Sequence, residues 1–148
     1  MPPEDAGEPV ADDEVLYRRV SDRSGWYDPS LDRPIAWEAF RPNERDLDGI
    51  SLWRARSYES PERVARIGAK ANRQYFLLVL RAGTLRSVGA TMLPTPSPAG
   101  PGHVTLANLS AIEYRRDRNA VRELAESIAH DLVEDVEGPF GPFDVTEG

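Results

Sequence analysis

The stretch Gln74-Tyr75-Phe76-Leu77-Leu78-Val79-Leu80 decides the fold that we expect for this sequence. It holds the only unbroken apolar run in the chain, and Arg73 and Arg81 bracket it. A helix that crosses a membrane needs about 20 apolar residues, so this run is too short to span one. It is also shorter than a typical buried helix, and its aromatic and aliphatic residues favour a strand covered on both faces. We therefore predict an inner strand, in the middle of a sheet.

The segments around this run have the composition of further strands and of helices. In residues 15–20, for example, Leu16, Arg18 and Val20 would share one face of an extended chain. From Asn119 to Val136, apolar residues recur at helical spacing and acidic residues occupy the opposite side, and we expect Asp117 to cap the start of this helix. The sequence therefore predicts an α+β fold class, with a small mixed or antiparallel sheet of about four or five strands and a C-terminal amphipathic helix packed on one face. The expected strands are 15–20, 50–55, 74–80, 90–93 and 103–106, and the expected shorter helices begin at Ser60-Pro61 and cover 82–89.

The two ends of the chain differ in composition from the middle. Residues 1–14 are rich in acids and proline, which predicts a disordered acidic tail. Residues 15–137 are expected to form a single α+β domain. Residues 138–148 form a Gly/Pro/Phe tail, in which Phe140 and Phe143 either fold back onto the domain or present an exposed peptide to a partner.

Composition excludes several classes of site. The chain has no cysteine and only two histidines, His103 and His130, so we expect no disulfide, no metal site and no cofactor. It contains no phosphate-binding glycine loop, no metalloprotease histidine pair and no nucleophile elbow, so we assign no catalytic residue. A nucleophile and base pair would need a serine with His103 or His130, and nothing in the local sequence indicates one. The N-terminus has no signal-peptide pattern, which favours a cytoplasmic protein.

The net charge of −7 hides a polarity along the chain. Residues 1–14 hold six acids and residues 123–148 hold eight, with no base in either segment. The residues between them therefore carry all 18 bases against 11 acids. This pattern is typical either of an ordinary solvated surface or of an anion-binding surface in the middle of the chain.

Several arginines lie on or beside the predicted strands. An arginine that faces inward needs a partner, either a carboxylate such as Glu38, Glu59 or Glu62, or the phosphate or carboxylate of a ligand. Aromatic side chains that could stack on such a ligand lie close by in the sequence, as does His103 at the start of a strand. The candidate ligand-binding residues are Arg18, Arg19, Arg54, Arg56, Trp53, Tyr58 and His103, with Tyr17 as a further nearby ring.

Short motifs also occur in a distinctive order. They are Leu-Tyr-Arg-Arg (Leu16–Arg19), Ala-Phe-Arg-Pro (Ala39–Pro42), the segment Ile50–Arg54, Ser-Pro-Glu (Ser60–Glu62), Ala-Gly-x-Leu-Arg-x-x-Gly (Ala82–Gly89) and Gly-His (Gly102-His103). Over roughly residues 15–110 this order resembles a family of small uncharacterised bacterial proteins. That family has no established activity, so the resemblance supplies no catalytic residues. The Tyr-Arg strand is also similar to the start of RES-type NAD-degrading toxins of the ADP-ribosyltransferase fold. That resemblance implies that Arg18 or Arg19 contacts the NAD phosphates and that Tyr58 stacks on nicotinamide; the Gly-Arg-Trp/Phe-Asn segment of those toxins is absent here.

Two functions are consistent with these patterns. The first is a non-enzymatic binding or accessory protein of a bacterial operon, which contacts a protein partner from the same operon or an anionic ligand through the arginine-rich middle. The alternative is an enzyme acting on NAD or another nucleotide, with Arg18, Arg54 and His103 near its site. Neither requires a membrane, and we do not expect DNA as a partner. An enzyme predicts a pocket where these side chains converge, whereas a binding module predicts an exposed surface.

Overall fold

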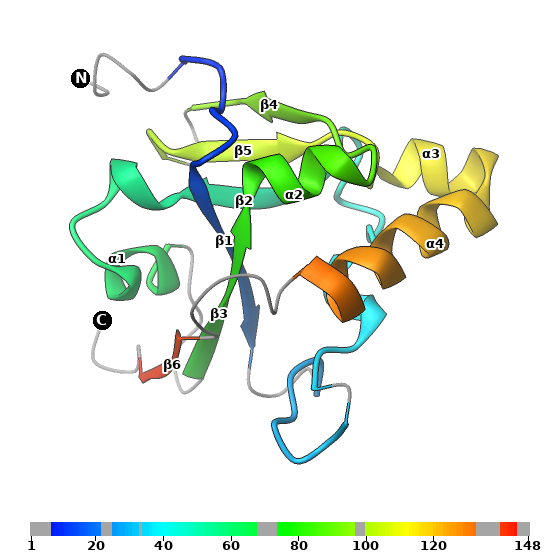
Figure 1. Ribbon diagram of the computed structural model, residues 1–148. Coiled ribbons are helices and arrows are strands. Elements are labelled where there is room, and N and C mark those ends of the chain that lie inside the picture. Colours follow the sequence, from blue (N-terminus) through cyan, green and yellow to red (C-terminus); the bar gives the residue numbers. More distant parts are fainter. Residues whose placement is uncertain are drawn as a thin grey trace.

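A six-stranded antiparallel sheet organises the fold, in the order β4-β5-β2-β1-β3-β6 (Figure 1). The computed structural model describes residues 7–21, 25–32, 34–67, 74–96, 100–132 and 140–144. The predicted α+β class is confirmed, with one strand more than the four or five expected. The strands are β1 (Val15–Ser21), β2 (Ile50–Arg54), β3 (Gln74–Arg81), β4 (Met92–Pro94), β5 (His103–Leu106) and β6 (Phe140–Asp144).

The apolar run predicted to be an inner strand is β3. It lies between β1 and β6, and it pairs with β1 along its whole length, from Val15 opposite Arg81 to Ser21 opposite Tyr75. Leu77, Leu78 and Leu80 have no exposed surface. The middle of the sheet is nevertheless the β2–β1 pair, so β3 is an inner strand one place from the edge.

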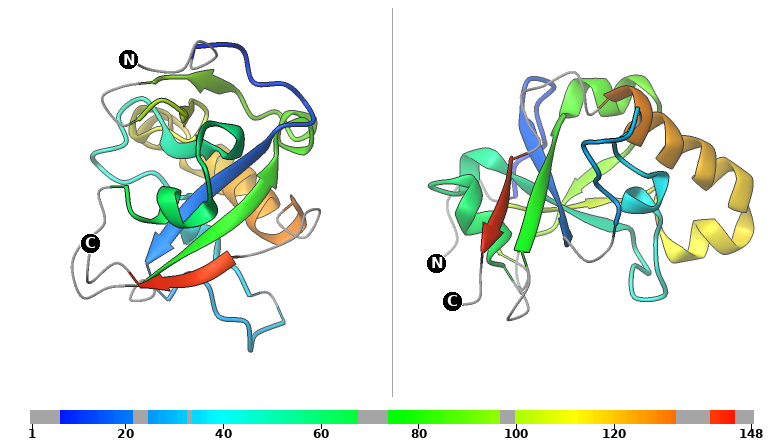
Figure 2. Two further views of the ribbon diagram at one scale, coloured as in Figure 1. Left: turned by 90° about the vertical axis from the view of Figure 1, so that its left-hand side faces the viewer. Right: turned by 90° about the horizontal axis from the view of Figure 1, so that it is seen from below.

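Short helical segments cover both faces of the sheet (Figures 1 and 2). One face carries the main core, in which Leu16, Leu78 and Leu80 pack with Phe40 and Ile128. No described helix is both long and apolar enough to cross a membrane. The segments are η2 (Trp37–Phe40), η3 (Ala55–Ser57), α1 (Pro61–Ala65), α2 (Ala82–Ser87), α3 (Ala111–Arg116), α4 (Arg118–Ser127) and the π-helix η4 (Ile128–Leu132).

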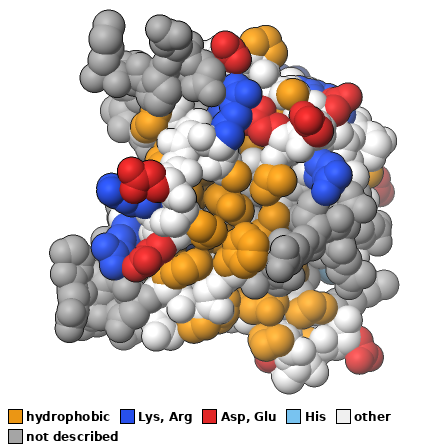
Figure 3. All heavy atoms as spheres, turned by 60° about the vertical axis from the view of Figure 1, so that its left-hand side comes forward, with side chains coloured by type: hydrophobic (Ala, Val, Ile, Leu, Met, Phe, Trp, Pro, Cys, Tyr) orange, Lys and Arg blue, Asp and Glu red, His pale blue; other side chains and the backbone are white. Residues whose placement is uncertain are grey.

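The second face carries a smaller apolar cluster beneath α1 and beside β6. Val64 of α1 is fully buried against it, whereas Phe140 and Phe143 of β6 are only partly buried. Figure 3 shows hydrophobic side chains gathered in the middle of the side on which α1 lies, with charged side chains next to them. The strand alternation explains the two clusters, because successive side chains of a strand point to opposite faces.

The C-terminal helix is interrupted rather than continuous over 119–136. Asp117 ends α3 and caps α4, where its side chain accepts a hydrogen bond from the N–H of Ala120 at 3.1 Å. Ser110 caps α3 in the same way through the N–H of Glu113. The predicted cap at Asp117 is therefore confirmed, but α4 ends at Ser127 and a π-helix follows to Leu132. Residues 133–136 lie outside the described part of the chain.

Both predicted tails differ from the structure where it describes them. Val10 is buried in the main core, and Glu14 is only 7% exposed, because it binds a buried arginine. Residues 7–14 are therefore packed on the domain, whereas residues 1–6 lie outside the described part. At the other end, Phe140 and Phe143 fold back: β6 pairs Phe140 with Leu77 and Phe143 with Tyr75.

Other local predictions are confirmed. Helix α1 begins at Pro61 after an extended Ser60, although the Ser60 side chain makes no capping hydrogen bond. Gly89 follows α2 with φ at +93°, a conformation that favours glycine. Gly49 precedes β2 with φ at +142°, and a side chain there would meet the carbonyl oxygen of Leu106 on β5. Only glycine therefore fits this turn without a shift of the backbone.

Candidate functional site

The predicted site residues are divided between the two faces of the sheet. Arg18 and Arg54 share the face of the main core with Leu16 and Leu52, by strand alternation. Arg19, Trp53 and His103 lie on the opposite face, where Trp53 and His103 are cross-strand partners. The three residues of the nucleotide-enzyme hypothesis, Arg18, Arg54 and His103, therefore do not converge at one place.

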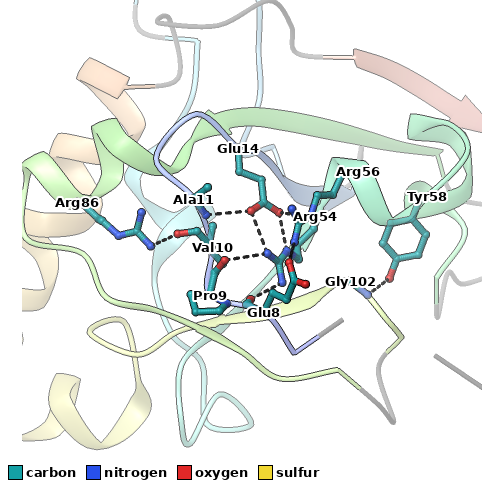
Figure 4. A network of polar contacts seen from close by, with 10 residues as sticks. All are labelled: Glu8, Pro9, Val10, Ala11, Glu14, Arg54, Arg56, Tyr58, Arg86 and Gly102. Carbon is teal, nitrogen blue, oxygen red and sulfur yellow. Dashed lines mark hydrogen bonds and ion pairs between the residues drawn. The ribbon is translucent and has the colours of Figure 1, made fainter. Parts of the chain in front are cut away.

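Arg54 is held by the protein itself rather than presented to a ligand. It has no exposed surface, and its Nε and Nη2 donate to the two carboxylate oxygens of Glu14 at 2.5 and 3.0 Å. Nη1 donates to the carbonyl of Glu8 at 2.7 Å and Nη2 to that of Pro9 at 3.2 Å, as Figure 4 shows. The internal carboxylate is thus Glu14, and none of the three predicted partners, Glu38, Glu59 and Glu62.

The same carboxylate also interacts with Arg56. Arg56 Nε lies 3.4 Å from Oε1 of Glu14, and its Nη2 lies 3.4 Å from Glu8. Burial opposes the ionisation of Glu14, but hydrogen bonds from Arg54 and Ala11 and the charges of both arginines outweigh it. The pKa of Glu14 therefore lies below its ordinary value. These contacts assign Arg54 and Arg56 to holding residues 7–14 on the sheet.

Arg18 of β1 donates hydrogen bonds to backbone carbonyls of η2 and β2. Its Nε donates to the carbonyl of Ala39 at 2.9 Å and its Nη1 to the carbonyl of Ser51 at 3.1 Å. Burial lowers the pKa of Arg18 to about 10, against the charge of Asp46, which raises it. The side chain connects η2 to the sheet, which is a structural role.

Arg19 lies on the second face and stacks on aromatic rings. Its guanidinium carbon lies 4.6 Å from the centre of the Tyr75 ring and 5.7 Å from that of Trp53. Nη1 donates to the carbonyl of Ala65 in α1 at 3.2 Å. Burial lowers the pKa of Arg19, and Tyr75 opposes this effect. No carboxylate of the described residues forms an ion pair with it.

His103 belongs to a chain of polar side chains on this face. Its Nε2 lies 2.7 Å from Ser51 Oγ, and its Nδ1 lies 2.8 Å from Thr95 Oγ1. Thr95 Oγ1 in turn lies 2.8 Å from Thr105 Oγ1. Burial lowers the pKa of His103, partly offset by the hydrogen bond with the Thr95 backbone. Sequence reasoning found His103 but not Ser51, which lies 52 positions away.

Tyr58 lies at the margin of this face. Its hydroxyl accepts a hydrogen bond from the N–H of Gly102 at 3.2 Å, which joins the segment after β2 to the start of β5. Burial raises the pKa of Tyr58, and the hydrogen bond from Gly102 opposes that rise. A tyrosine held in this way positions the strand that carries His103.

A second candidate site, which the sequence did not indicate, lies on α3, α4 and η2. We call it the arginine–aromatic surface. Two arginines share the ring of Trp37, with Arg122 at 4.8 Å and Arg41 at 5.8 Å from its centre, and Arg118 lies 5.3 Å from the centre of the Tyr114 ring. These three arginines and the neighbouring Arg115 are exposed, and the two rings are partly buried. The surface consists of Trp37, Arg41, Tyr114, Arg115, Arg118 and Arg122.

A hollow of about 290 Å³ lies within this surface. Arg41 and Arg115 line it from different segments, and Tyr114, Pro42 and Glu44 also contribute. Among the described residues no carboxylate lies within 4.0 Å of Arg41, Arg115 or Arg118, whereas Arg122 pairs with Glu126 at 2.7 Å. A larger hollow of about 590 Å³ lies on the other side of α3, where Arg116 is paired with Glu113 at 3.2 Å.

The described residues contain no group of three or more potential metal ligands. Comparisons with models of protein families, with curated proteins and with solved structures found no match.

Proposed function

We propose that this chain binds an acidic segment of a protein partner through the arginine–aromatic surface, a role that involves no catalysis at that surface. The observation that carries the proposal is a set of exposed arginines, three of which lie over half-buried rings. Arg41, Arg115 and Arg118 have no carboxylate within 4.0 Å among the described residues. Stacking on a ring limits the positions of a guanidinium, so less entropy is lost when it binds a ligand.

The residue types favour a protein partner over a nucleic acid. Arginine, tryptophan and tyrosine are enriched at the energetic centres of protein interfaces. Leu47 and Ile112 are two of the exposed large hydrophobic side chains, 51% and 50% exposed. Each follows one residue of a hydrogen-bonded pair, in which the N–H of Ala111 donates to the carbonyl of Asp46. Apolar groups beside free positive charges complement an acidic segment with hydrophobic residues.

Neighbouring arginines of α3 provide a matched test. Arg115 lines the hollow of the arginine–aromatic surface, whereas Arg116 is also exposed but pairs with Glu113 and lines the other hollow. We would measure binding of a fluorescent peptide of alternating glutamate and leucine by anisotropy. We expect Arg115→Glu to weaken binding by about tenfold, or about 1.4 kcal/mol, and added salt to weaken wild-type binding. Arg116→Glu should bind almost as the wild type does.

Ligands of other classes serve as further arms of the experiment. Thermal-shift measurements with NAD, ATP and a short RNA test the nucleotide alternative, because a ligand that binds only the folded state raises the melting temperature. If RNA or a nucleotide raised the melting temperature, Arg115→Glu abolished that rise and the peptide did not bind, the ligand of this surface would be a nucleic acid or nucleotide instead of an acidic segment. Equal loss of peptide binding in Arg115→Glu and Arg116→Glu would refute the assignment of this surface.

A further inference from the structure

A serine and a histidine face each other on the second face of the sheet, away from the arginine–aromatic surface. Ser51 of β2 and His103 of β5 come from neighbouring strands, in which Ser51 pairs with Thr105 and Trp53 with His103. The two side chains are therefore diagonal neighbours, and Ser51 Oγ lies 2.7 Å from His103 Nε2. Both residues keep part of their surface exposed.

The contacts of the other ring nitrogen determine the direction of this hydrogen bond. His103 Nδ1 lies 3.2 Å from the carbonyl oxygen of Thr95, which accepts hydrogen bonds but cannot donate them. This contact favours a proton on Nδ1, so that Nε2 carries a lone pair and accepts the hydroxyl proton of Ser51. The Thr95 hydroxyl, which also contacts Nδ1, has Thr105 Oγ1 as a second partner at 2.8 Å. A base held in this tautomer beside a hydroxyl is the arrangement that activates a serine nucleophile.

Two buried polar atoms beside the pair have no partner among the described residues. They are Nε1 of Trp53 and Oγ of Ser57. The Trp53 ring packs edge-on against His103, with 5.6 Å between ring centres, and Ser57 packs closely against Gly102, which precedes His103. Buried polar groups are almost always satisfied, so exceptions indicate a bound water or ligand, or a functional role.

We propose that Ser51 is a nucleophile activated by His103 and that it takes the acyl group of small carboxylic esters. Ser51 Oγ attacks the carbonyl carbon, and its proton moves to His103 Nε2. The bond from that carbon to the alkoxy oxygen breaks, and the leaving oxygen takes the proton from Nε2 and departs as an alcohol. Water, deprotonated by His103 in the same way, then attacks the acyl carbon. The bond from that carbon to Ser51 Oγ breaks, Oγ takes the proton back from Nε2, and a carboxylic acid leaves. The sum of these steps is ester plus water giving acid plus alcohol, with Ser51 and His103 restored.

The test uses the full chain and a fluorophosphonate probe, which reacts with activated serines. We expect a covalent adduct on Ser51, found by intact mass and peptide mapping, and no adduct in Ser51→Ala. His103→Gln should slow labelling about 100-fold or more, since general-base assistance contributes at least this factor. Ser87→Ala is the matched control, because that serine is exposed and its hydroxyl donates to the carbonyl of Thr84 rather than to a histidine, and it should be labelled as the wild type is. Melting temperatures show whether each variant is folded.

A wild-type measurement keeps the test independent of any substitution. The labelling rate should fall as the pH falls through the pKa of His103, which lies below its ordinary value of 6.5. Hydrolysis of p-nitrophenyl acetate should follow the same pH dependence and the same order of variants. The absence of an adduct on Ser51, or labelling of folded His103→Gln at the wild-type rate, would overturn the proposal.

Discussion

The carboxylate of Glu14 and the guanidinium of Arg54 form a buried two-point ion pair. The two donor–acceptor distances are 2.5 and 3.0 Å, and Arg54 has no exposed surface. Charges removed from water are tolerated only with close partners, and backbone carbonyls of residues 8 and 9 accept from the remaining donors of Arg54. The pair therefore attaches the segment before β1 to β2.

Removal of one member of this pair should be more damaging than removal of both. We expect Glu14→Leu or Arg54→Met to lower the free energy of unfolding by about 3–5 kcal/mol, because a single substitution leaves an uncompensated group in the interior. The double variant Glu14→Leu/Arg54→Met should lose less than the sum of the two. Urea denaturation followed by circular dichroism measures all three. Arg63→Ala is the control, because its pair with Glu59 is exposed and should contribute less than about 1 kcal/mol. Additive losses would contradict this account.

Acid should destabilise the protein in two stages. His103 and Glu14 both have a pKa below the ordinary value in the folded state, so the unfolded chain binds more protons as the pH falls. The contribution of His103 is complete above its unfolded pKa of about 6.5 and is lost as the pH falls through its folded pKa. That of Glu14 is complete above about 4.5 and is lost below it in the same way. Melting temperatures between about pH 8 and pH 3 measure both stages.

Two variants separate these stages. His103→Gln should remove the loss of stability at the higher pH and leave the lower one. Glu14→Gln should lower the stability at neutral pH and flatten the curve below about pH 5. A wild-type melting temperature that stays constant from pH 7 to about pH 5, with a folded His103→Gln variant behaving identically, would show that His103 does not have the lowered pKa.

Local sequence was sufficient to predict most elements but not their long-range partners. The alternation of Leu16 and Val20, the apolar run of β3 and the cap at Asp117 are properties of neighbouring residues, so pattern reasoning found them. The ion pair of Arg54 with Glu14 joins residues 40 positions apart, and any of the other carboxylates in the chain could balance the charge of Arg54 equally well. The chain supplies no local signal that distinguishes Glu14 from Glu38 or Glu59. A burial pattern cannot specify which buried charge meets which carboxylate.

The candidate sites show the same limit. Tyr114 and Arg118 are four positions apart, but Asp117 ends α3 and begins α4 between them, so their contact depends on the turn between the two helices and not on helical spacing. Trp37 and Arg122 meet only because η2 packs on α4, and that packing depends on the whole core. Ser51 and His103 meet because β2 pairs with β5 in one register, and a shift of one residue would turn Ser51 to the other face.

The last strand, β6, should protect the edge of the sheet. Phe140 packs edge-on against Tyr17 at 6.2 Å between ring centres, and β6 pairs with the outer side of β3. Removal of residues 140–148 would leave the backbone groups of β3 unpaired and expose Tyr17 and Leu77, so we expect a lower melting temperature and self-association that rises with concentration. Removal of residues 145–148 alone keeps β6 and is the control.

Phe140→Ala should lower the free energy of unfolding by about 2 kcal/mol without association, because it removes apolar contact but leaves the strand. Sedimentation velocity distinguishes the two effects, and a shortened chain that stays monomeric at the wild-type melting temperature would show that β6 is dispensable.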